Sequence, residues 1–81
     1  MEFKFIADPD HAWLKVEKSI AELVGYAPTT FDYEDSKHYY FEQDCSAFDF
    51  IKKYEAHYQC RAEFTDTKYE ENFRETVRSC A

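Results

Sequence analysis

Three histidines and one cysteine are the side chains of this chain that could perform acid–base or nucleophilic chemistry. They are His11, His38, His57 and Cys45. A thiol at the start of a helix becomes a better nucleophile because the helix N-terminus lowers its pKa, and a neighbouring histidine can accept its proton. However, no spacing in the sequence commits these side chains to one site, and the adjacent Asp44 opposes the helix effect. The nucleophile elbow, the phosphate-binding glycine loops and the HExxH signature are also absent. The sequence therefore predicts a protein that is not an enzyme.

Metal and cofactor sites are not predicted either. Asp8 and Asp10 have the spacing that begins a calcium loop, but Ser19 stands at the twelfth position, where such a loop needs Glu. The three cysteines are widely spaced. They have neither the paired spacing of a zinc site nor the even number of a disulfide framework. We expect no cofactor, and reduced thiols with a structural role.

The segment of residues 32–49 is the strongest candidate for a binding surface. It contains six acidic residues and a single basic one, Lys37, in an 81-residue chain with a formal net charge of −7. Tyrosines alternate with the carboxylates, so a strand here must direct some of them outward. Such a surface offers phosphate-like charge and aromatic anchors to a basic protein. The predicted partner-binding residues are Asp32, Tyr33, Glu34, Asp35, Tyr39, Tyr40, Glu42, Asp44 and Asp49.

Direct binding of nucleic acid is not expected, because 17 acidic residues oppose 10 basic ones and phosphate contacts require clustered Lys and Arg. The run Tyr39, Tyr40 and Phe41 could stack on bases, but Asp35 and Glu42 flank it. A simpler alternative remains open for the whole acidic segment, which is that its charge only keeps the protein soluble.

The hydrophobic pattern predicts a single α+β domain over residues 1–81. In ββαββαβ order, the predicted strands lie at residues 3–6, 12–16, 31–34, 38–43 and 60–65, and the predicted helices at residues 17–24 and 45–58. Gly25 is the expected C-cap of the first helix and Asp44 the expected N-cap of the second. This order favours one mainly antiparallel sheet of four to five strands with two helices packed on it.

Eight phenylalanines and seven tyrosines must supply most of the core, because Ile, Leu and Val are scarce. Phe3, Phe5, Phe48 and Phe64 are expected on core faces. Trp13 is expected on the opposite side of its strand from the core residue Leu14. The tail from residue 67 onward could form either a helix or an edge strand.

The N-terminus lacks the basic start and long apolar stretch of a signal peptide, and no run approaches the length of a membrane span. We therefore expect a cytoplasmic protein in a host bacterial cell. A chain this short buries a modest core, so a homodimer is also possible.

Two short stretches carry a resemblance to a known group of proteins. Residues 8–16 contain His-Ala-Trp-Leu-Lys-Val, and residues 39–47 contain an aromatic-x-Glu-x-Asp-Cys-x-Ala pattern. Together they resemble small proteins of phages and other mobile elements, over about residues 3–60. Many such proteins with known roles block host defence by binding CRISPR or restriction machinery. The resemblance therefore implies an anti-CRISPR-like or anti-restriction-like inhibitor, and it assigns no residues.

Two hypotheses of function follow. The first is a non-enzymatic acidic protein that covers a nucleic-acid-binding surface of a host defence complex. The alternative is a small ligand-binding domain or enzyme that uses His11, Trp13 and Cys45.

Overall fold

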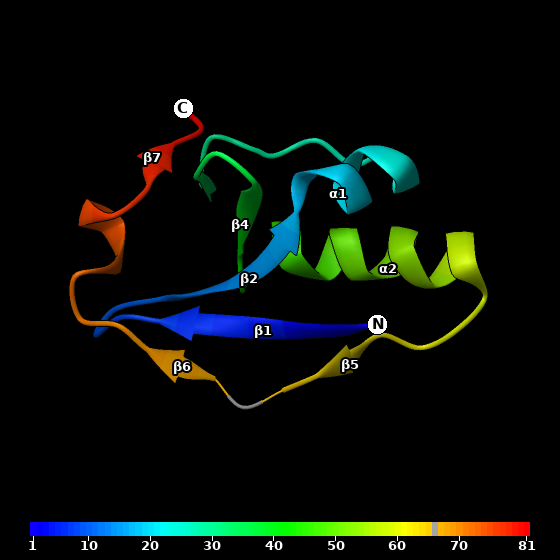
Figure 1. Ribbon diagram of the computed structural model, residues 1–81, viewed down its shortest axis with the longest axis horizontal. Coiled ribbons are helices and arrows are strands. Elements are labelled where there is room, and N and C mark those ends of the chain that lie inside the picture. The colour runs from blue at the N-terminus through cyan, green and yellow to red at the C-terminus, as the bar shows by residue number, and fades with distance from the viewer. Residues whose placement is uncertain (66) are drawn as a thin grey trace.

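A mixed β-sheet with two α-helices on one face forms the frame of this α+β protein (Figure 1). The computed structural model describes residues 1–65 and 67–81. The strands are β1 (Glu2–Ala7), β2 (Ala12–Glu17), β3 (Tyr33–Glu34), β4 (His38–Glu42), β5 (Glu63–Phe64), β6 (Lys68–Tyr69) and β7 (Arg78–Ser79). The helices are α1 (Lys18–Val24), α2 (Ser46–Tyr58) and the short 3-10 helix η1 (Phe73–Glu75).

The first two strands fold as their pattern predicts, whereas the strand predicted at residues 31–34 is reduced to β3. β1 and β2 form an antiparallel hairpin in which Phe5 pairs with Leu14 and Ile6 with Trp13. Its turn is stabilised by the Asp8 carboxylate, which accepts the N–H groups of Asp10 and His11 at 2.9 and 2.8 Å. The predicted hairpin is confirmed.

Both predicted helices are confirmed, with one change at a cap. Gly25 ends α1 in the left-handed conformation, with φ of 77°, which glycine adopts without strain. α2 begins at Ser46, and Cys45, not Asp44, occupies its N-cap position without a side-chain capping bond. The backbone N–H of Asp44 instead donates to the Glu42 carboxylate at 3.0 Å. The predicted cap was therefore wrong.

The sheet is larger than predicted and is mixed. It has seven strands in the order β5-β1-β2-β4-β3-β7, with β6 also paired to β1. The predicted strand at residues 60–65 is present as the shorter β5, but the prediction of four to five mainly antiparallel strands missed β6 and the parallel pairing of β5 and β6 with β1 along one edge. These pairings are parallel because the chain leaves α2 near the N-terminus and then runs along β1 in the same direction. It pairs with β1 at two places, β5 and β6 (Figure 1).

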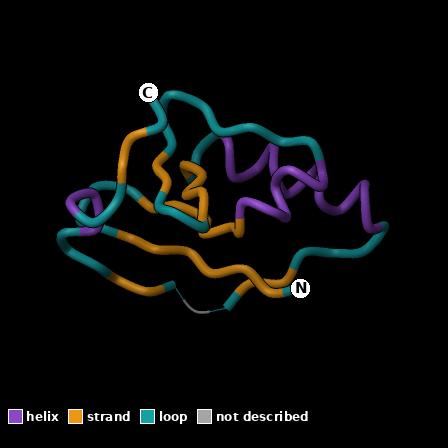
Figure 2. Tube along the Cα trace, turned by 45° about the horizontal axis from the view of Figure 1, so that its top comes forward, coloured by secondary structure: helices purple, strands orange, loops and turns teal. Residues whose placement is uncertain are grey.

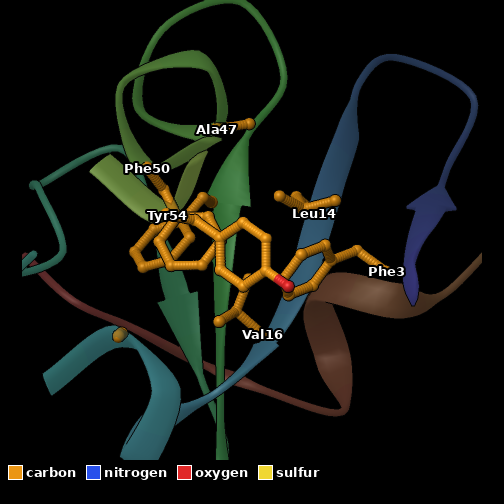
Figure 3. Packing of buried hydrophobic residues seen from close by; sticks show 8 residues of the cluster. Phe3, Leu14, Val16, Ala47, Phe50 and Tyr54 are labelled. Carbon is orange, nitrogen blue, oxygen red and sulfur yellow. The ribbon is translucent and has the colours of Figure 1, made fainter. Parts of the chain in front are cut away.

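The main core lies between the sheet and α2. Phe3, Leu14 and Val16 from the sheet meet Phe50 and Tyr54 from the helix (Figure 3). Phe3 contacts both of these helix rings edge-on, with centroids 5.5 and 5.0 Å apart, a favoured aromatic geometry.

Two of the four phenylalanines expected in the core lie on the surface instead. Phe48 is 58% exposed and Phe64 46% exposed. On α2 the buried apolar side chains are Ala47, Phe50 and Tyr54, which follow the three-and-four spacing of one helix face. Phe48 lies one residue from Ala47, and so about 100° around the helix, which directs it to solvent.

The second face of the sheet is also buried, and the C-terminal tail covers it. Trp13 is 2% exposed, and its ring centroid is 4.9 Å from that of Phe73 in η1. Ile6 and Tyr40 complete this cluster. In Figure 2, η1 and β7 lie at the opposite side of the molecule from α1 and α2. The ambiguous tail is therefore a 3-10 turn flanked by two short strands.

An ion-pair clamp ties this tail to the β1–β2 turn. The Arg74 guanidinium donates to Asp8 at 2.8 Å and to Asp10 at 3.1 Å. Burial alone would raise the pKa of Asp8, but hydrogen bonds from Arg74 and from the N–H groups of His11 and Asp10 lower it to about 2.

Within the described part of the chain, neither α-helix has the length and apolar character needed to cross a membrane.

We expect Phe73→Ala to lower the free energy of unfolding by about 3–5 kcal/mol, because it empties a fully packed aromatic site on the second face. Phe31→Ala is the matched control, since Phe31 is 68% exposed and its loss should cost no more than about 0.5 kcal/mol. Urea unfolding followed by circular dichroism measures both values. Equal stabilities of the two variants would contradict the structural role of the tail.

The clamp also predicts a dependence of stability on pH. Because the folded-state pKa of Asp8 lies below its usual 3.8, the clamp stabilises the fold above that pH and is lost as the pH falls toward about 2. We expect Asp8→Asn to be less stable than the parent near neutral pH and to lose less stability on acidification. Urea unfolding across this range tests the expectation, which an unchanged pH slope in the variant would contradict.

Candidate functional site

Asp32 is the buried centre of the acidic segment. Its side chain is fully buried. One carboxyl oxygen accepts the Glu42 N–H at 2.8 Å and the Ser46 hydroxyl. The other accepts the Thr29 N–H at 2.7 Å and the Thr29 hydroxyl at 3.1 Å. All four contacts are with donors, as a carboxylate requires, so Asp32 joins the 26–32 loop to the ends of β4 and α2.

Asp35 organises the turn between β3 and β4. Its Oδ1 atom accepts the N–H groups of Lys37 and His38 at 2.9 and 2.7 Å, and its Oδ2 atom accepts the Tyr40 hydroxyl at 2.6 Å. Burial would raise the pKa of Asp35, but the hydrogen bond from Tyr40 and the two backbone bonds hold that pKa well below its usual range. Burial and the same bond raise the pKa of Tyr40.

Glu34 and Tyr39 face α1. The Glu34 carboxylate accepts from Lys18 at 2.6 Å and lies 3.9 Å from Arg78, and the hydrogen bond from Lys18 lowers its pKa. The Lys18 ammonium also lies 5.1 Å from the centroid of the Tyr39 ring. These charges are therefore satisfied within the chain.

A shallow hollow of about 580 Å³ lies where β2 begins and β4 ends. We call it the Trp13 hollow. It is lined by Trp13, Phe31, Tyr33, Thr30, His11, Glu42, Asp44, Cys45 and Arg74. Its volume falls in the range of about 300–1,000 Å³ that is typical of ligand sites. It combines exposed aromatic surface with carboxylates.

The Trp13 hollow brings together the residues of the enzymatic alternative. His11 Nδ1 lies 3.9 Å from one oxygen of Glu42, and the Cys45 thiol donates to the other at 3.3 Å. Burial and this bond to a carboxylate raise the pKa of Cys45. The contacts therefore favour the thiol over the thiolate that a nucleophile requires.

Of the nine predicted partner-binding residues, Tyr33, Glu42 and Asp44 line the Trp13 hollow. Asp49 is exposed in the first turn of α2. Asp32 and Tyr40 are buried, so predicting them as contact residues was wrong. Both side chains make their hydrogen bonds with groups inside the fold.

The remaining three predicted residues, Glu34, Asp35 and Tyr39, are partly exposed and engaged with neighbours in the chain. Sequence reasoning missed Phe31, Thr30 and Arg74. A large apolar residue beside two threonines and an aspartate was one available signal for Phe31. No sequence signal pointed to Arg74, because only the folding of the distant C-terminal tail brings it to the hollow.

No three His, Cys, Asp or Glu side chains are grouped so that they could hold a metal ion, over residues 1–65 and 67–81. Neither a protein-family model, nor a curated protein, nor a solved structure matches this chain. The geometry of the Trp13 hollow is therefore the basis for a functional proposal.

We expect Asp32→Asn to destabilise the fold by about 3 kcal/mol or more, because an amide NH₂ would face buried donors that need an acceptor. Asp44→Asn makes the same change on an exposed residue and should cost no more than about 0.5 kcal/mol. Thermal or urea unfolding distinguishes the two variants. Similar stabilities would show that the buried network is not required.

Proposed function

We propose that this chain is a non-enzymatic acidic protein that binds a basic protein surface and covers a nucleic-acid-binding site there. The observation that carries the proposal is the Trp13 hollow, where Phe31 is 68% exposed beside the carboxylates of Glu42 and Asp44. Exposed aromatic side chains that are held in place make effective anchors in protein interfaces.

The charge of the chain supports a basic partner. The formal net charge of −7 attracts positively charged surfaces over several ångströms and speeds association. The same charge repels nucleic acid. Because the chain and nucleic acid would occupy the same basic surface of the partner, they would compete for it. The proposed contact surface is the Trp13 hollow and the neighbouring exposed Asp44 and Asp49. Segment 32–49 as a whole is not included, because Asp32, Glu34 and Asp35 serve the fold.

The class of partner follows from the two sequence stretches that resemble phage and mobile-element proteins. We include in the proposal that the partner is a nucleoprotein complex of host defence, of the CRISPR or restriction kind, which makes the chain an inhibitor. A protein that only needs to occupy a surface requires no catalytic group.

We expect the chain, used as bait in a bacterial lysate, to recover a nucleic-acid-binding protein and to displace nucleic acid from it in a competition assay. Raising the salt from about 0.1 M to about 1 M shortens the Debye length from about 10 to about 3 Å and should release the partner. Asp44→Lys with Asp49→Lys should weaken binding about tenfold or more.

The control is Glu17→Lys with Glu22→Lys, which changes the net charge equally. Glu17 ends β2, at the opposite end of that strand from Trp13, and Glu22 is exposed on α1. This variant should keep most of the affinity. Equal losses in both variants, or a partner that retains its nucleic acid, would contradict the proposal.

A further inference from the structure

We propose that the Trp13 hollow is a seat for an arginine side chain of the partner protein. In this arrangement the guanidinium group binds the carboxylates of Glu42 and Asp44 and stacks on the ring of Phe31. This inference rests on the proposed function and names the group of the partner that the hollow recognises.

Glu42 has one oxygen available to a ligand. Its Oε2 atom accepts the Asp44 N–H at 3.0 Å and the Cys45 thiol at 3.3 Å. Among residues 1–65 and 67–81, its Oε1 atom has only the contact with His11 at 3.9 Å, which is too long for a hydrogen bond. The side chain lines the hollow and is 15% exposed, so the carboxylate is partly shielded from water. A partly desolvated carboxylate binds a cationic donor strongly.

Phe31 supplies the aromatic face. The hydroxyl of Thr29 accepts its N–H at 3.2 Å, and Thr29 and Asp32 on either side are joined by two side-chain bonds. The backbone that carries the ring is therefore anchored. Anchoring the loop lowers the ordering cost of presenting an aromatic face to a flat cation.

The molecule already contains this mode of binding in the lining of the hollow, to which Arg74 and Trp13 both belong. The Arg74 guanidinium lies 5.5 Å from the centroid of the Trp13 ring while it donates to Asp8 and Asp10. Phe31, Glu42 and Asp44 repeat the set of one aromatic ring and two carboxylates, and no Lys or Arg of the described chain pairs with Glu42 or Asp44, whose one ionic contact is that of Glu42 with His11 at 3.9 Å. Arginine suits this set better than lysine because its planar fork can bind a carboxylate and stack at the same time.

Trp13, which lines the hollow, also carries a polar group that is unpaired among the described residues. Its indole N–H is buried and has no acceptor within the part of the chain that the structure describes. Buried donors are almost always paired. This N–H is enclosed by the fold, so the proposed contacts of the arginine are with Phe31, Glu42 and Asp44 and not with this group.

The test uses three blocked pentapeptides that carry arginine, lysine or citrulline at the centre between glycines. Citrulline has nearly the shape of arginine without its charge. Trp13 is the only tryptophan, so its fluorescence reports binding, and backbone chemical shifts give the location. We expect the arginine peptide to bind at least about threefold more tightly than the lysine peptide, and the citrulline peptide to bind weakest.

Two variants and one control locate the seat. Phe31→Ala and Glu42→Gln should each weaken binding of the arginine peptide by about fivefold or more. Phe48→Ala removes a ring that is also largely exposed, at 58%, but does not line the hollow, and it should leave the affinity unchanged. Circular dichroism confirms that each variant is folded.

Equal binding of the arginine and citrulline peptides, or equal effects of Phe31→Ala and Phe48→Ala, would overturn the arginine seat. Salt-sensitive capture of a nucleic-acid-binding protein without arginine preference would overturn the seat and leave the proposed function standing. Arg78 is an alternative occupant from a second copy, since its side chain is 77% exposed. Self-association in light scattering that is lost in Arg78→Ala would show that the chain itself fills the hollow, which also overturns the proposal.

Discussion

Asp32 joins its own loop to the end of β4, the start of α2 and the C-terminal tail. Its carboxyl oxygens bind Thr29, Glu42 and Ser46, and its backbone carbonyl accepts the N–H of Cys80 at 2.9 Å. These bonds fix the loop that carries Phe31 and the end of the strand that carries Glu42. The exposed aromatic ring and the available carboxylate are thus held at one place by a residue that never reaches the surface. A buried carboxylate is costly unless all its oxygens are paired, and here they are.

The second constraint is that the sheet is buried on both faces by different means. The two α-helices cover one face, as their amphipathic patterns imply. The tail covers the other with the ring of Phe73 and the clamp between Arg74 and Asp8. The Trp13 hollow lies where this cover stops short of the 26–32 loop. A chain rich in aromatic residues and poor in aliphatic ones leaves such partly covered rings at the edges of its core, where they can serve recognition.

Regular, local features of the fold were predictable, and features set by distant contacts were not. The β1–β2 hairpin and both α-helices follow from alternation, helical spacing and the glycine at position 25, all of which act within a few residues. Phe48 and Phe50 could not be separated by pattern alone, because either ring gives an apolar stripe and only the packing of α2 on Phe3 and Phe41 selects Phe50. The parallel pairing of β5 and β6 with β1 depends on the return path of the chain, which carries no local signal.

For the candidate site, the sequence by itself determined the chemistry available, which is carboxylates and aromatic rings concentrated in one segment of an acidic chain. The sequence could not determine which of these carboxylates and rings remain free of partners within the fold. An aspartate that binds a partner and an aspartate that satisfies buried donors have the same local signature, since the difference lies in the groups that folding brings near them. Tertiary structure therefore buried Asp32, paired Glu34 and Asp35 with groups of the same chain, and left Phe31, Glu42 and Asp44 with His11 and Cys45 at the Trp13 hollow.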